Sequence, residues 1–258
     1  MYKVIIVFLL CGLLIIPCSF ALAQGWAIKF AGNPGQQVQT KNSPSLSISD
    51  KALTMEAWIF PTGDGVVINK ENSYECALVG GQLQFAIQAP TWAWFGKGLV
   101  PVNQWNHVAI TYDGSESICW VNGKNTASDK TNSGNIVVTG DPFNVGWRPF
   151  GDHQPFSGTI DEVRISNVVR YTKEFKVPTT AFVIDNDTVI LLHFDEGNGK
   201  TTKDVSGNRN DCEIIGDPEW VKSNAPIADV KFSVEKQDKL STTWAMLKVN
   251  NQITHVSF

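Results

Sequence analysis

The chain has 258 residues, of which 43% are hydrophobic and 18% are charged, and its formal net charge is -4. This length and apolar content suit one large domain, with or without a tail. The absence of a basic excess argues against nucleic acid or an anionic membrane surface as a partner, because little positive charge is available to neutralise phosphates.

The N-terminal segment 1–23 has the pattern of a secretory signal peptide. Residues 4–16 form an uninterrupted apolar run, and residues 21–23 (Ala-Leu-Ala) fit the small-x-small cleavage rule. We therefore expect a mature chain that starts at Gln24, is secreted or surface-associated, and has no membrane span after cleavage. A retained signal anchor remains an alternative, because residues 4–23 are nearly long enough to cross a bilayer.

Short strand-like runs separated by turn residues dominate the next two hundred positions. This rhythm is typical of a sandwich or jelly roll and differs from that of βαβ units. The predicted strands are 25–30, 53–60, 66–69, 82–88, 107–112, 118–121, 143–145, 159–165 and 188–194. The pattern predicts an all-β, antiparallel two-sheet jelly-roll domain over residues 24–222.

The segment 105–124 carries the clearest evidence for antiparallel strands. Two alternating apolar runs end at Asp113-Gly114 and Asn122-Gly123, dipeptides that supply the positive φ angles of tight hairpin turns. Helix signals are sparse in the domain, and residues 167–176 are the one candidate, expected as a short turn before Pro178. Segment 223–258 is predicted to be a separate C-terminal tail that is partly helical or disordered.

Three cysteines remain after signal cleavage: Cys76, Cys119 and Cys212. Cys76 and Cys119 alternate with apolar neighbours, so both are expected to point into the core, where cysteine behaves as a small hydrophobe. No metal-ligand spacing joins the three. An odd number leaves at least one thiol free or paired between chains, and the sequence does not tell whether any two pair.

Four motifs together resemble the laminin-G-like jelly-roll domains of the concanavalin A-like lectin/glucanase superfamily. They cover most of residues 26–221 in compatible order and spacing. The motifs are LTMEAWI at 53–59, WNHVAITYDG followed by WVNGK at 105–124, GTIDEVRI at 158–165, and LHFDEG at 192–197 with DVSGN at 204–208. In the family the last motif usually precedes the domain. Here it follows, and we expect it to fill the same place in the sandwich, because sandwich termini often lie close together; a truncated second copy is the alternative.

The superfamily includes glycoside hydrolases, so paired carboxylates are the chemistry to look for. The hydrolase pattern of the superfamily resembles E-x-D-x-x-E, which this sequence lacks. Asp161 and Glu162 are adjacent, so in a regular strand they would face opposite sides. Glu56 has no second carboxylate nearby in sequence, and His107 and His193 belong to no recognisable triad. We therefore predict no catalytic residue and no enzymatic activity.

Many relatives of this fold bind calcium through carboxylates and loop carbonyls. In pentraxin-like members an acidic run follows the strand that resembles residues 143–146. Here the corresponding residues 147–150 are Trp-Arg-Pro-Phe, which disfavours such a site. Asp161 remains a candidate calcium ligand through its place in the family motif.

The candidate ligand-binding residues are aromatic with polar neighbours, the combination that stacks on sugar rings and fixes their hydroxyls. They are Trp92, Trp94, Trp147, Arg148, Asp152 and His153. Trp92 and Trp94 alternate and so share one face of an extended segment. Packing is the competing interpretation for all three tryptophans, and it is the one we adopt for Trp58, Trp105 and Trp120.

The sequence thus predicts an exported, non-enzymatic module that binds a carbohydrate or an extracellular protein. Two alternatives remain open. One is a glycoside hydrolase or lyase that uses carboxylates dispersed over the sandwich. The other is a purely structural cell-surface component whose tail is the functional part. Fold alone does not decide among them.

Overall fold

The computed structural model describes residues 25–150 and 154–228. Their strands are β1 Trp26–Ala31, β2 Gln37–Thr40, β3 Leu53–Pro61, β4 Gly65–Lys70, β5 Tyr74–Val79, β6 Gln82–Ile87, β7 Trp94–Leu99, β8 Asn106–Tyr112, β9 Ser117–Val121, β10 Lys124–Asp129, β11 Phe143–Val145, β12 Ser157–Ser166, β13 Thr188–Leu192, β14 Thr201–Thr202, β15 Cys212–Ile215 and β16 Glu219–Lys222. No helix occurs in these two ranges.

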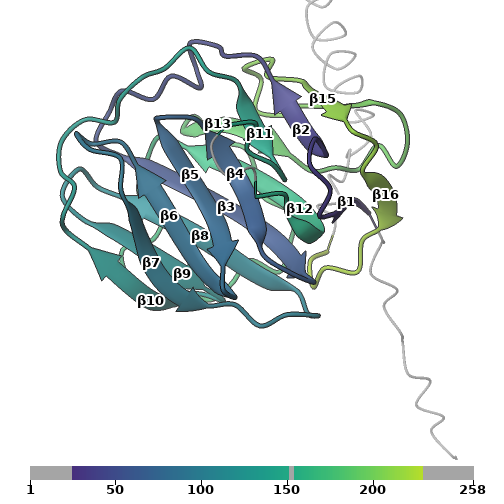
Figure 1. Cartoon of the computed structure of the whole chain (residues 1–258), viewed down its shortest axis with the longest axis horizontal. Helices are drawn as coiled ribbons and strands as arrows, with labels where there is room; N and C mark the ends of the chain where they lie inside the picture. Colours follow the sequence, from purple (N-terminus) through teal and green to yellow (C-terminus); the bar gives the residue numbers. More distant parts are fainter. Residues whose placement is uncertain (1–24, 151–153, 229–258) are drawn as a thin grey trace, which may run out of the picture.

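The strands form two antiparallel sheets that pack face to face (Figure 1). The first sheet has the order β10-β9-β8-β3-β12-β1-β16, with β13 also paired to β12. The second has the order β14-β15-β2-β11-β4-β5-β6-β7. This arrangement confirms the predicted all-β jelly-roll sandwich.

The two consecutive hairpins formed by β8, β9 and β10 follow the sequence pattern closely. Val108 pairs with Val121 across β8 and β9, and Asn122 and Gly123 take φ angles of 51° and 76° in the turn to β10. The Asp113 side chain accepts hydrogen bonds from the amides of Ser115 and Glu116, which fixes the other turn. The turn residues therefore set the register of three neighbouring strands.

The core lies between the sheets and is filled by alternate residues of both. Ile59 and Ile110 of the first sheet and Phe85 of the second are at most 1% exposed. Cys76 and Cys119 also belong to this core, as expected, and all three described cysteines are free thiols. Burial of this continuous apolar layer is the main driving force for the fold.

Residues 167–187 connect β12 to β13 along the chain and cross the outer face of the first sheet; they are here called the strap. The helix candidate at 167–176, expected as a short turn, is irregular chain with bends. The reason is packing: the Tyr171 and Phe175 rings stack on each other with centroids 3.6 Å apart, and both contact the outward-facing His107. The strap gives this sheet face a second apolar layer that includes Trp58, Phe182 and Leu191.

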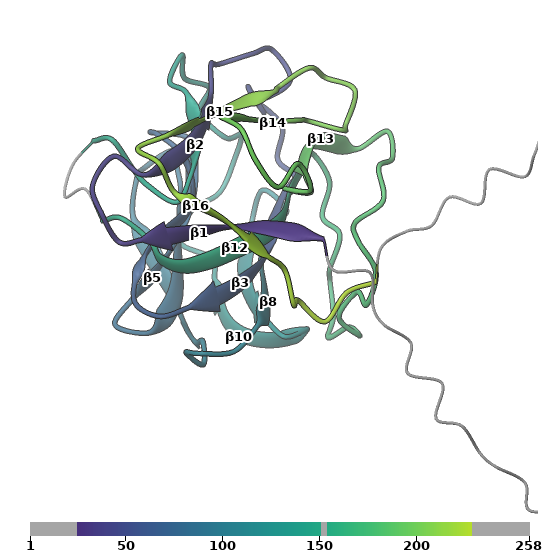
Figure 2. The ribbon, with the colours of Figure 1, turned by 90° about the vertical axis from the view of Figure 1, so that its right-hand side faces the viewer.

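The C-terminal strands complete both sheets, as Figure 2 shows. β16 pairs with β1, and β15 pairs with β2. The Asp195 carboxylate, within the motif that usually precedes the domain, accepts a hydrogen bond from the amide of Trp26. Residues 188–222 therefore close the same sandwich, and the alternative of a truncated second copy does not apply to them.

The predicted signal peptide lies outside the described residues, as does the tail beyond residue 228. Within the described ranges, no helix has the length and apolar character that a membrane crossing requires.

Candidate functional site

Trp92 and Trp94 lie side by side where the chain enters β7. Their ring centroids are 6.1 Å apart and the rings are nearly perpendicular. Trp94 is 37% exposed, and Trp92 is partly buried. The loop that carries Trp92 is held by Asn132, whose amide donates to the carbonyls of Ile87 and Thr91. The buried Asn132 thus fixes the aromatic pair before any ligand arrives.

Arg148 joins this pair from the loop between β11 and β12. Its guanidinium carbon lies 5.9 Å from the centre of the Trp92 ring, within cation–π range. The same guanidinium makes a bidentate ion pair with Glu71 at 2.9 Å and lies 3.6 Å from Glu75. Arg148 therefore neutralises two buried carboxylates and covers Trp92, so Trp94 offers the more accessible ring.

A row of polar side chains crosses the outer face of the second sheet and leads to this cluster. Gln39, Asn144, Asn69 and Glu75 occupy matching register positions on neighbouring strands, and the row continues through Ala86 to Trp94. Their side chains form a chain of hydrogen bonds: Gln39 to Asn144, Asn144 to Asn69, and Asn69 to Glu75. Asn69, Glu75 and Asn144 are fully buried, so this row supports the site and does not itself face solvent.

An open groove of about 400 Å³ runs beside Trp94, between the edge strands of the two sheets. Its polar lining comes from β6, β7 and β10: Gln84, Lys97, Ser128 and Asp129. β7 passes very close to β10 next to the groove, where a Cβ at Gly98 would overlap Thr126. Sequence reasoning missed these four residues, since they lie on strands that meet only after the sandwich has formed.

The remaining candidates for ligand binding fall in different places. Trp147 is the sequence neighbour of Arg148 and is partly buried. Asp152 and His153 lie outside the described residues. Trp58 and Trp120 are at most 4% exposed, as expected for packing, and Trp105 is partly buried with its indole donating to Asn224. The structure thus brings Trp92, Trp94 and Arg148 together.

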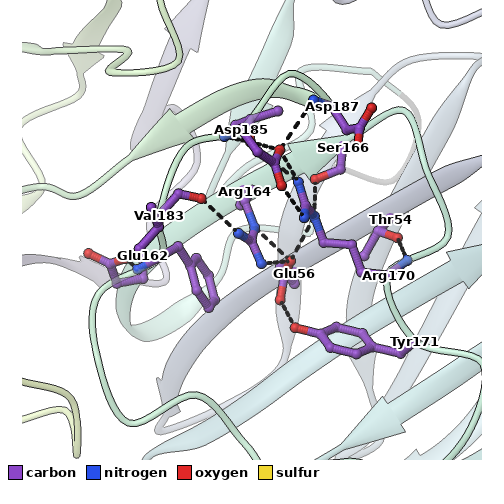
Figure 3. Close-up of polar contacts among 12 residues, drawn as sticks. Thr54, Glu56, Glu162, Arg164, Ser166, Arg170, Tyr171, Val183, Asp185 and Asp187 are labelled. Carbon is purple, nitrogen blue, oxygen red and sulfur yellow. Dashed lines mark hydrogen bonds and ion pairs between the residues drawn. The ribbon is translucent and has the colours of Figure 1, made fainter.

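Three residues of the family motifs meet beneath the strap, as Figure 3 shows for Glu56 and Arg164. The carboxylate of Glu56 accepts hydrogen bonds from Arg164, His107 and Tyr171 at 2.7–3.1 Å. Burial alone would raise the pKa of Glu56, but the His107 hydrogen bond and the Arg164 charge outweigh it and lower the pKa to about 2. Glu56 is fully enclosed, so this group holds the strap and has no route to a substrate.

Asp161 and Glu162 do not face opposite sides, contrary to the sequence prediction. The register slips between Asp161 and Arg164, and Glu162 has a φ of 51°, which is a β-bulge. Ile160 and Val163 both point into the core, so the two carboxylates between them turn away from it together.

Both carboxylates of the bulge have structural partners. Asp161 accepts hydrogen bonds from the Ser223 hydroxyl and the Glu162 amide, and burial raises its pKa well above the usual range. Glu162 binds His193 and the amide of Phe182 in the strap. Among the described residues, no group of three or more His, Cys, Asp or Glu side chains is arranged to hold a metal ion.

The two sheets, the polar support and the half-exposed aromatic pair define a jelly-roll sandwich domain with a surface groove. A laminin G family model, described as the concanavalin A-like lectin/glucanases superfamily, matches residues 31–175. The chain belongs to this superfamily. No curated protein matches it.

Solved structures share the fold. A Bacteroides ovatus protein described as a candidate for carbohydrate binding aligns with a TM-score of 0.62 and 21% identity, over 80% of this chain and 62% of that protein. The chain therefore spans less than two thirds of that protein. A pentraxin of Limulus polyphemus aligns with a TM-score of 0.48 and 15% identity, over 78% of this chain and 93% of the pentraxin. The sialidase CBM40 of Ruminococcus gnavus, solved with sialyllactose, aligns with a TM-score of 0.47 and 14% identity, over 58% of this chain and 93% of the CBM40 chain.

Proposed function

We propose that this chain is an exported, non-enzymatic module that binds glycans through the aromatic pair Trp92 and Trp94. The observation that carries the proposal is the 37% exposure of Trp94 beside an open groove with polar lining. A large, fixed aromatic face next to amide, hydroxyl and charged groups is what sugar binding requires, because ring C–H groups stack while hydroxyls are hydrogen-bonded.

The support around Trp94 favours a binding role. Asn132 fixes the loop of Trp92, and Arg148 packs on the Trp92 ring, so little side-chain freedom remains to be lost on binding. The proposal agrees with the description of the Bacteroides ovatus protein that shares the fold. Export follows from the signal-peptide pattern of residues 1–23, and the glycan would then be extracellular or periplasmic.

Hydrolysis is disfavoured by the state of the carboxylates that the structure brings together. Glu71 and Glu75 are buried and held by Arg148 and Asn69. Asp161 and Glu162 are buried and held by Ser223 and His193. A glycosidase needs two carboxyl groups that flank an accessible bond. We leave calcium outside the proposed function, because Asp161 already accepts two hydrogen bonds in a buried position.

A panel of immobilised and soluble polysaccharides tests the proposal by affinity electrophoresis. The wild-type protein should be retarded by at least one of them, and Trp94→Ala should weaken that binding about tenfold or more. Leu99→Ala is the matched control, since Leu99 is an exposed apolar residue of the same strand. Release of new reducing ends by the purified protein would overturn the non-enzymatic assignment. Equal retardation of wild type and Trp94→Ala, or none with any polysaccharide, would overturn glycan binding at this site.

A further inference from the structure

We infer that the groove beside Trp94 binds an internal segment of an uncharged polysaccharide, with one sugar ring stacked on Trp94 and its hydroxyls bound by Lys97 and Asp129. This inference rests on the proposed function and narrows it to a ligand class. It assigns to β6, β7 and β10 a role that the sequence motifs do not suggest.

The size and openness of the groove suit an internal segment of a polysaccharide. A volume of about 400 Å³ lies within the range of small-molecule sites, roughly 300–1,000 Å³. The groove is open to solvent and does not enclose a ligand. Selection of a chain end requires walls where the chain would otherwise continue. An open groove does not enclose a chain end, so we expect the polysaccharide to continue on both sides of the stacked ring.

Of the two tryptophan rings in the pair, Trp94 has the face that is available for stacking on a sugar. Arg148 lies over the Trp92 ring, whereas Trp94 is more exposed and lines the groove. We therefore expect one sugar ring to stack, on Trp94, with its neighbours held by polar contacts. Trp92 then supports Trp94 from the side at a centroid distance of 6.1 Å.

The charged groups of the lining balance each other, which favours an uncharged sugar. The groove contains one ammonium group, Lys97, and one carboxylate, Asp129. Both oxygens of Asp129 accept a hydrogen bond from Thr131, one from its amide and one from its hydroxyl, so the carboxylate is held in place with lone pairs left over. Sugar hydroxyls can donate to Asp129 and accept from Lys97. An acidic sugar would bring a second negative charge beside Asp129, which is unfavourable.

Affinity electrophoresis of the full chain against neutral and acidic polysaccharides tests the ligand class. The neutral set is a β-glucan, a mannan, a galactan and an arabinan, and the acidic set is polygalacturonate and alginate. We expect retardation by a neutral polymer that persists in 0.5 M NaCl, a salt level at which exposed charge pairs are screened. Retardation by the acidic polymers alone, abolished by salt and by Lys97→Met, would overturn the inference.

Three variants test the groove itself. Asp129→Asn and Lys97→Met should each weaken binding several-fold. Lys124→Met is the matched control, because Lys124 is a lysine of the same strand as Asp129 that pairs with Glu174 and does not line the groove. If Trp94→Ala weakens glycan binding but Asp129→Asn and Lys97→Met leave it unchanged, the proposed function stands and the groove assignment fails. If no polysaccharide binds, both fail.

Calorimetry with oligosaccharides of the bound polymer tests recognition of an internal segment. We expect affinity to rise at least tenfold from the monosaccharide to the tetrasaccharide, and to be unchanged when the reducing end is converted to the alditol. A monosaccharide that binds as tightly as the tetrasaccharide, or a strong effect of end modification, would instead show chain-end recognition and overturn this part.

Discussion

Glu56 illustrates how single residues in this protein combine burial with charge. It accepts hydrogen bonds from three different elements: His107 of β8, Arg164 of β12 and Tyr171 of the strap. A carboxylate in this setting is stable only while its partners remain, since desolvation is unfavourable and the hydrogen bonds and the positive charge offset it. The carboxylate of the first family motif thus links three elements of the fold.

Replacing Glu56 by Gln should destabilise the protein by about 3–5 kcal/mol, because Arg164 would remain buried without its counter-charge. Urea unfolding at pH 7 measures the loss, and Glu213→Gln, an exposed carboxylate of β15, is the control that should change stability by less than about 0.5 kcal/mol. A Glu56→Gln protein as stable as the control would contradict the structural role of Glu56.

The lowered pKa of Glu56 predicts how the free energy of unfolding depends on pH. The pKa of Glu56 is about 2 in the folded chain, below its ordinary value of 4.5. A lowered pKa contributes stability that is fully present above 4.5 and is lost as the pH falls from 4.5 toward 2. Urea titrations across this window should therefore show a steeper loss for the wild type than for Glu56→Gln. Parallel curves for the two proteins would argue against the lowered pKa.

Arg148 predicts a second stability effect at the candidate site. Arg148→Ala should cost about 3–5 kcal/mol, because Glu71 and Glu75 lose the guanidinium that neutralises them. Arg148→Lys keeps the charge but cannot form the bidentate pair, so it should restore only part of the loss. Urea unfolding should give a free energy of unfolding that is highest for the wild type, lower for Arg148→Lys and lowest for Arg148→Ala. Equal stability of the Lys variant and the wild type would contradict the bidentate pair as the source.

At the level of elements, the strap shows what local sequence can and cannot predict. The alternation in 107–112 predicts β8 correctly because that strand is apolar and regular. The strap carries no comparable pattern, since its conformation depends on the outer face of a sheet formed by distant segments.

The bulge at Glu162 could not be predicted for a similar reason. The alternation rule assumes a regular strand, and the strap amide of Phe182 pairs with Glu162 only in the folded chain. β10 is polar, as an exposed edge strand can be, and so gave no apolar signal.

A glycine in the β9–β10 turn tests how the strap docks. A Cβ at Gly123 would overlap the carbonyl oxygen of Phe175, so Gly123→Ala combines this clash with the strain of a positive φ. Gly80→Ala is the matched control, because Gly80 also has a positive φ but has open space around its Cα. We expect about 1–2 kcal/mol of loss for Gly80→Ala and a larger loss for Gly123→Ala, with faster amide exchange in residues 170–182 only in the latter. Equal losses and equal exchange would indicate that the strap does not press on this turn.

At the level of the whole molecule, the family resemblance predicted the sandwich, and the closing strands define its extent. The family model ends at residue 175, yet β15 and β16 pair with β2 and β1. The convergence of Trp92, Trp94 and Arg148 was not predictable in the same way. Arg148 is more than fifty residues from the tryptophans, and only the order β11-β4-β5-β6-β7 brings them to one face.

A pair of truncations tests the extent of the domain. A chain of residues 25–194 lacks the partners of β1 and β2 in the C-terminal strands and should lose cooperative thermal unfolding, whereas residues 25–228 should keep it. Circular dichroism melts of both, compared with the mature chain, measure this. Cooperative unfolding of residues 25–194 would show that the closing strands are dispensable.

The pairing of β1 with β16 also determines how the domain would respond to tension. Trp26 and Lys222, the first and last residues of this pair, are register partners, and the Lys222 ammonium lies 3.8 Å from the centre of the Trp26 ring. A pulling force between the two ends of the domain therefore acts across these antiparallel hydrogen bonds and loads them one after another. The force would first separate Ala228 from the strap and Ser223 from Gly25, and the β1–β16 pair would then open residue by residue from the Trp26–Lys222 contact.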